Sequence, residues 1–155
     1  MSIQRKHVHL IVEADNARAL AKGMQSLQVS AARHLNAAVS LEQGRKRTGR
    51  VFSDRYHARI LETPREVKNA IAYVLGNWRH HRDDGGFESM FWEIDPFSTA
   101  RSFAGWADLR DPDTPRDGLD GLGPLPHADA RTWLLTVGWQ KAGSISVTHV
   151  PGEAQ

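Results

Sequence analysis

The sequence predicts a mixed α+β fold, and three patterns carry that prediction. Residues 7–12, "HVHLIV", are β-branched and apolar with alternation at their start, which is typical of a short strand. Residues 14–39 repeat apolar side chains at helical spacing. Residues 63–81 begin with helix-capping signals and carry an apolar stripe. The chain of 155 residues is long enough for one domain with a usable core.

The strand places its two histidines together. Alternate side chains of a strand leave opposite faces, so His7 and His9 share a face, roughly 6.5–7 Å apart along the chain. Two imidazoles at that spacing can hold one metal ion if a third protein group joins them. Taken alone, the pattern is more typical of a partly buried, hydrogen-bonded histidine pair than of a metal site.

Residues 14–39 predict a long helix, with Asp15 or Asn16 available as its N-cap. Apolar side chains recur along one face of this helix, and such a row is typical of a face turned toward a core. The row consists of Leu20, Met24, Leu27, Ala31 and Leu35.

A basic, glycine-containing loop follows at residues 42–50, "EQGRKRTGR", and residues 51–61 predict two short strands with a turn near Ser53 and Asp54. Basic side chains on such a loop suit contacts with a phosphate backbone, although a solvated loop has the same composition. The candidates for DNA contacts are Arg45, Lys46, Arg47, Arg50 and Arg55.

The helix at residues 63–81 has the strongest local signals. Thr63 and Glu66 form a T-x-x-E capping box, and Pro64 occupies the first helical position. Its expected buried stripe consists of Val67, Ala70, Ile71, Val74, Leu75 and Trp78.

Tyr73 lies on this helix away from the stripe. At about 100° per residue, it falls roughly 130° from the stripe centre, and Asn77 follows one turn later on the same face. Both side chains are therefore available either for a neighbouring strand or for solvent. If this helix packs on the histidine face of the strand, Tyr73 and Asn77 meet His7 and His9, which is an arrangement suited to attack on a phosphodiester.

The charge is unevenly distributed along the chain. Residues 1–82 hold 15 Lys and Arg against 6 Asp and Glu, whereas residues 83–155 hold 5 against 12. A basic first half indicates a polyanionic partner such as nucleic acid, unless the two halves neutralise each other within one fold.

Residues 83–155 predict an acidic C-terminal arm. Residues 111–127 are rich in Asp, Gly and Pro and read as a linker, and residues 130–143 favour a short helix over a strand. Six aromatic side chains are expected to anchor the arm on the rest of the chain: Phe87, Phe91, Trp92, Phe97, Phe103 and Trp106.

The sequence contains no cysteine, which excludes disulfides, thiolate zinc sites and a cysteine nucleophile. Its apolar runs are far too short for a membrane span, and no secretory pattern is visible. These features predict a cytoplasmic protein without a membrane partner.

Four stretches in order resemble the single-tyrosine HUH transposases, especially the REP-associated tyrosine transposase branch found in bacteria. They are "HVHLIVEA", "ARALAKGMQSLQVSAARHLN", "GRVFSDRYHARIL" and "REVKNAIAYVLGN", and the tail "RTWLLTVGW" is also similar. The likeness is strong over residues 3–82 and weak beyond them. It implies a ferredoxin-like antiparallel sheet packed by helices, with residues 1–82 as the catalytic and DNA-binding domain.

The resemblance also implies roles for the site residues. His7, His9 and Asn77 match the ligands of Mg²⁺ or Mn²⁺, and Tyr73 matches the nucleophile, which cleaves single-stranded DNA beside a hairpin. The reaction leaves a 5′-phosphotyrosine and a 3′-hydroxyl that can rejoin strands without ATP. Tyr56 matches an aromatic position of the hairpin region instead. Relatives include monomers and homodimers.

The resemblance contains one departure. Members of the family carry a strand and a helix before the histidine motif, whereas six residues precede His7 here, so an N-terminally truncated copy with an open sheet edge is expected. Two alternatives to an active transposase therefore stay open. One is an inactive remnant that binds DNA hairpins, and the other is a metal-binding structural protein that does not meet DNA.

Overall fold

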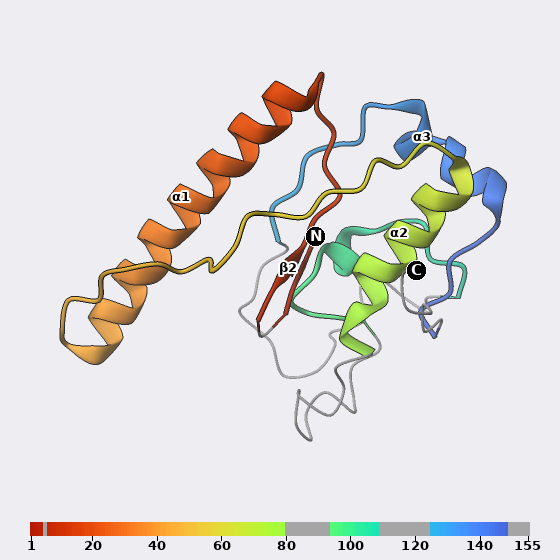
Figure 1. Cartoon of the computed structure of the whole chain (residues 1–155). Helices are drawn as coiled ribbons and strands as arrows, with labels where there is room; N and C mark the ends of the chain where they lie inside the picture. The colour runs from red at the N-terminus through yellow and green to blue at the C-terminus, as the bar shows by residue number, and fades with distance from the viewer. Residues whose placement is uncertain (5, 80–93, 109–124, 149–155) are drawn as a thin grey trace. The chain divides into compact units, whose positions relative to one another are not determined.

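The computed structural model describes residues 1–4, 6–79, 94–108 and 125–148 (Figure 1). The chain forms two compact units. The hairpin unit contains residues 1–11 and 61–155, and the long-helix unit contains residues 12–60. The predicted boundary at residue 82 lies outside the described residues.

The α+β class is confirmed at the level of a small antiparallel sheet combined with helices. Strand β1 (Ser2–Ile3) pairs with β2 (Val8–His9), so that Ser2 lies opposite His9 and Ile3 opposite Val8. The predicted strand is shorter than expected, because its pairing ends at His9. The larger ferredoxin-like sheet remains a prediction.

The outer edge of β1 is occupied by the C-terminal arm. The Ile3 amide donates to the Phe97 carbonyl at 2.9 Å, the Thr99 amide donates to the Met1 carbonyl at 2.8 Å, and Ser2 forms an antiparallel bridge with Ser98. Figure 1 shows this segment running beside the hairpin. These bonds satisfy main-chain groups on the outer edge of β1 from within the chain, whereas the open edge predicted for a truncated sheet stays a prediction.

Helix α2 (Pro64–Gly76) begins as the sequence predicts. The Thr63 side chain accepts a hydrogen bond from the Glu66 amide at 3.2 Å, and the Glu66 carboxylate accepts one from the Thr63 amide at 3.0 Å. Pro64 fills the first turn, where no intrahelical donor is needed. The predicted stripe is buried apart from Ala70, which is half-buried: Val67, Ile71, Val74, Leu75 and Trp78.

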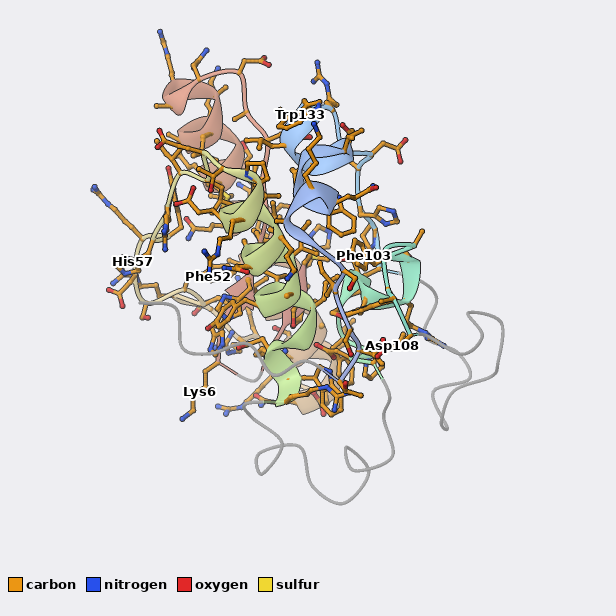
Figure 2. All side chains as sticks on the ribbon, turned by 90° about the vertical axis from the view of Figure 1, so that its right-hand side faces the viewer. Lys6, Phe52, His57, Phe103, Asp108 and Trp133 are labelled. Atoms are coloured by element: carbon orange, nitrogen blue, oxygen red, sulfur yellow. The ribbon has the colours of Figure 1, made fainter. Side chains whose placement is uncertain are left out.

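The C-terminal arm packs on α2. It contains a 3₁₀ helix η3 (Thr99–Ser102), the short helix α3 (Trp133–Thr136) and a second 3₁₀ helix η4 (Gly138–Ala142), and η4 lies against α2. The short helix confirms the element expected near the end of the chain. Trp133, Phe103 and Asp108 are labelled along this arm in Figure 2.

Aromatic rings form the inner part of the arm. The Phe103 ring centroid lies 5.3 Å from that of Trp106 and 5.5 Å from that of Trp139. Gly105 is required there, because a Cβ atom on it would approach the rings of Phe103 and Trp139 to 2.5 Å. Phe103 and Trp106 therefore act as the predicted anchors. The prediction is wrong for Phe97, whose side chain is 41% exposed. The other three predicted anchors lie outside the described residues: Phe87, Phe91 and Trp92. Residues 111–124 of the predicted linker also lie outside them.

The long-helix unit consists of α1 (Ala17–Gln43) and the irregular segment that follows it. Asn16 caps the helix by accepting the Ala19 amide at 2.9 Å, and Gly44 ends it in the left-handed conformation with φ 62°. The prediction of a core-facing row is wrong, since no residue of α1 is buried, and Leu27 and Leu35 are 47% and 48% exposed. Within its own unit, the helix has no second layer against which to bury that row.

The two strands predicted within residues 51–61 are also absent. Their residues form bends and irregular structure and have no strand partner in the described part of the chain, so the β propensity of "VFSDRYHARIL" has nothing to pair with. No helix among the described residues is both long and apolar enough to cross a membrane.

Two carboxylates in the arm have opposite environments. Asp95 is 1% exposed and accepts hydrogen bonds from Ser2, Gln4 and the Phe97 amide, and its burial raises the pKa above the ordinary value of 3.8. Asp108 is exposed, and its pKa is lowered, first by the hydrogen bond from the Ser146 hydroxyl and then by that from the Val147 amide.

These shifts predict opposite pH dependences of stability. A raised folded-state pKa means that the contribution of Asp95 is full below pH 3.8 and is lost as the pH rises through its folded-state pKa. The contribution of Asp108 is present above pH 3.8 and is lost as the pH falls through its lowered pKa. The free energy of unfolding, measured by urea titration at intervals of about half a pH unit between roughly pH 2 and pH 7, checks the sign of both pH dependences. Asp95→Asn should flatten the curve above pH 3.8, and Asp108→Asn should flatten it below. Identical curves for the two variants would contradict the assignment.

Candidate functional site

The hairpin fixes the two histidines. The Gln4 amide donates to the His7 carbonyl at 2.9 Å and closes the turn, and the ladder sets His9 opposite the fully buried Ser2. The imidazole centroids of His7 and His9 lie 4.7 Å apart with the rings at 74°. The two rings are therefore close neighbours, with His7 exposed and His9 half-buried.

Helix α2 brings Tyr73 to this pair. The Tyr73 ring centroid lies 5.1 Å from that of His9, and the planes meet at 81°, an edge-to-face contact. Tyr73 is half-buried and borders the core formed by α2 and the arm. The structure therefore brings Tyr73 to His7 and His9, from which it is separated by 64 or more residues in the chain.

Asn77 is the C-cap residue of α2 and keeps near-helical backbone angles, with φ −61° and ψ −29°. Those angles hold it one turn beyond Tyr73. Its side chain is almost fully buried at 1% exposed, yet its amide nitrogen makes no hydrogen bond within the described residues. A buried amide nitrogen without a hydrogen bond lowers the free energy of unfolding by about 1–3 kcal/mol, so Asn77 is retained at the expense of stability.

These donors suit a divalent cation. Two imidazole nitrogens and an amide oxygen are ligands that Mn²⁺ and related ions accept, and Asn77 offers a buried amide one helical turn beyond Tyr73. No group of three or more His, Cys, Asp and Glu side chains gathers in the described part of the chain.

The basic loop belongs to the long-helix unit, and its predicted DNA-contacting residues are all exposed: Arg45, Lys46, Arg47, Arg50 and Arg55. Hydrogen bonds hold its first part on α1. The Arg47 amide donates to the Ser40 hydroxyl at 2.8 Å, and the Asn36 side chain donates to the Gly49 carbonyl at 3.1 Å. The Arg47 guanidinium also donates to the Asn36 amide oxygen. Arg47 thus helps to shape the loop.

Sequence reasoning missed the polar residues that support the hairpin. Ser2, the cross-strand partner of His9, forms a hydrogen-bonded group with Gln4 and Asp95, and no local pattern marks this group because Asp95 lies 93 residues from Ser2. The sequence also gave no sign that Asn36 and Ser40 hold the basic loop. Tyr56 is half-buried and belongs to the long-helix unit, whereas Tyr73 belongs to the hairpin unit.

Residues 1–77, half of the chain to within one residue, match the family model described as "Transposase IS200 like". The match spans His7, His9, Tyr73 and Asn77 and ends at the last of them. The chain therefore belongs to the IS200-like transposase family. No curated protein and no solved structure gives a significant match.

At the level of the family, the chain is a transposase-like, DNA-binding protein of DNA transposition, and such proteins generally use a divalent metal ion.

Replacing Asn77 by Leu, which has the same branching, should leave stability unchanged or raise the free energy of unfolding by up to about 1–3 kcal/mol. The reason is that the substitution removes a buried amide whose nitrogen has no partner among the described residues. Urea unfolding at fixed pH measures it. Asn69→Leu, on the exposed side of the same helix, is the control and should stay within about 0.5 kcal/mol. A clear loss of stability in Asn77→Leu would show that the amide is held by favourable contacts.

Proposed function

We propose that the protein is a single-tyrosine DNA strand transferase that cleaves and rejoins single-stranded DNA beside a hairpin. One observation carries the proposal: the Tyr73 ring lies against the His9 ring, 5.1 Å between centroids, within the stretch that matches the transposase family. A nucleophile and a histidine pair far apart in sequence are thus adjacent in one compact unit.

Tyr73 is the nucleophile of the proposed reaction. Its hydroxyl oxygen attacks the phosphorus of a phosphodiester, a bond forms between that oxygen and phosphorus, and the bond to the 3′ oxygen breaks. The phenolic proton passes to solvent, and the departing 3′ oxygen takes up a proton to become a hydroxyl. A 3′-hydroxyl of the same or another strand then reverses the exchange, so one phosphoester replaces another and no ATP is consumed.

His7, His9 and Asn77 are the proposed ligands of Mg²⁺ or Mn²⁺. When bound, such an ion supplies charge stabilisation and orientation for the phosphate oxygens. The imidazoles contribute their neutral nitrogens, and the hairpin fixes their orientation through the pairing of Ser2 with His9. The C-cap position of Asn77 sets the third ligand at the end of the helix that carries the nucleophile.

The basic loop is the proposed contact with the DNA backbone. Arg45, Lys46 and Arg50 are exposed on a segment that hydrogen bonds hold at the end of α1. Guanidinium and ammonium groups at such a place bind phosphate without reading sequence. Arg55 extends the same charge farther along the loop.

A covalent adduct tests the nucleophile. Labelled single-stranded hairpin DNA from the ends of the protein's own locus, incubated with the protein and Mn²⁺, should give a band that survives a denaturing gel. Tyr73→Phe should abolish the band, because the attacking oxygen is removed. The chain has only two tyrosines, so Tyr56→Phe is the matched control and should retain the band.

The other outcomes are equally informative. An adduct that persists in Tyr73→Phe and disappears in Tyr56→Phe would reassign the nucleophile. A wild-type protein that binds the hairpin in a salt-sensitive way without any adduct would be the inactive DNA-binding remnant. An adduct that forms equally well after chelation of divalent ions would remove the proposed role of His7, His9 and Asn77.

The loop proposal predicts a change in salt dependence. Substituting Arg45, Lys46 and Arg50 by Gln should weaken binding of single-stranded DNA and reduce the slope of log K against log salt by up to about 2. Fluorescence anisotropy over a salt series measures this slope. Arg47 is left in place because it holds the loop on α1.

The control for this series removes the same charge from the same unit. Arg18, Lys22 and Arg33 are exposed on α1, and their substitution by Gln should change the slope much less. Equal slopes for both triple variants would mean that the DNA responds to the total charge of the unit and that the loop has no special role.

A further inference from the structure

The C-terminal arm contributes a strand-like segment to the hairpin. Residues 97–99 pair with Met1–Ile3 through the amides of Ile3 and Thr99 and through the bridge between Ser2 and Ser98. The arm lies beyond residue 77, where the match to the transposase family ends. The family match therefore assigns no role to this part of the site's support.

Asp95 anchors that segment to the hairpin. Its Oδ2 accepts hydrogen bonds from the Ser2 hydroxyl at 2.9 Å and from the Gln4 amide side chain at 3.1 Å, and its Oδ1 accepts the Phe97 amide at 2.8 Å. The Gln4 side chain also donates to the Ser2 hydroxyl at 2.6 Å. Asp95 and Ser2 are both almost fully buried, so water does not replace these bonds.

The group lies beside His9, across the antiparallel ladder. Ser2 is the cross-strand partner of His9, and Gln4 closes the turn through the carbonyl of His7. His9 in turn contacts the ring of Tyr73. A continuous set of contacts therefore links the Asp95 carboxylate through Ser2 and His9 to the proposed nucleophile.

We propose that Asp95 is a positioning residue for the active site and that the C-terminal arm is an integral part of that site. By holding Ser2 and Gln4, Asp95 fixes the hairpin so that His9 faces Tyr73. The proposal rests on the proposed function for its catalytic meaning, while the contact it depends on can be measured without catalysis.

The main test follows the His9–Tyr73 contact by NMR. Nuclear Overhauser effects between the two rings should be present in the wild-type protein and lost in Asp95→Ala. Ser2→Ala removes one hydroxyl from the same group and should weaken them with less risk to folding. Signals of Val67 and Ile71 in the core report whether each variant is folded.

Asp108→Ala is the matched control. Asp108 is another carboxylate of the arm, and it accepts hydrogen bonds from Ser146 and Val147, which belong to the arm itself. Its removal should leave the contact between His9 and Tyr73 intact. Intact ring contacts in folded Asp95→Ala and Ser2→Ala, or their equal loss in Asp108→Ala, would overturn the proposal.

A second readout uses Mn²⁺ alone. Paramagnetic broadening of the His7 and His9 ring signals should need about ten-fold more Mn²⁺ in Asp95→Ala, the size of effect seen for residues that orient metal ligands. If the wild-type protein forms neither an adduct nor a Mn²⁺ complex, the proposed function fails, whereas the ring contact still tests the role of Asp95. If the adduct forms and the contact between the His9 and Tyr73 rings is unchanged in Asp95→Ala, only the positioning role of Asp95 fails.

Discussion

The hairpin unit depends on the pairing of β1 with the segment at residues 97–99. A two-stranded hairpin is marginal in water, and the isolated bridge at Ser98 with its two flanking main-chain hydrogen bonds adds support along the outer edge of β1. That pairing buries Ser2, and the ladder then sets His9 opposite it. The face of α2 that carries Tyr73 meets a histidine whose backbone is already fixed. The geometry of the site thus originates in main-chain hydrogen bonds made by residues that have no part in the proposed chemistry.

Helix α2 contributes both to the stability of the core and to the candidate site, and the polar groups of the site reduce the stability that the helix provides. Its stripe from Val67 to Leu75 forms much of the core, and its last residues carry a half-buried tyrosine and a buried amide. A helix end devoted only to stability would place apolar side chains there. Retaining Asn77 instead lowers stability in the part of the chain that also matches the transposase family. Such local costs are common where a site needs polar groups.

Local signals in the sequence predicted α2 well and failed for the long-helix unit. The capping box of Thr63 and Glu66 needs only neighbouring residues, so the start of α2 could be predicted. The Leu27 and Leu35 row has helical spacing, but its burial requires a second layer that the unit does not contain. In the site, the spacing of His7 and His9 and the offset of Tyr73 pointed to side chains whose rings lie close together in the fold, while their chemical roles stay predictions. The role of Asp95 could not be predicted from local patterns, because it bonds to Ser2 across a separation of 93 residues.

The long separation between Ser2 and Asp95 also governs when the site can form during synthesis. His7 and His9 leave the ribosome early, followed by Tyr73, but the segment that closes the edge of β1 emerges only after all of them. Until then the hairpin has one open edge, and closing so long a loop is an entropically costly, slow step. Because the arm is synthesised after the histidines and Tyr73, the hairpin that carries His7 and His9 gains its long-range support only once the arm has been made. The site is therefore assembled at a late stage of folding.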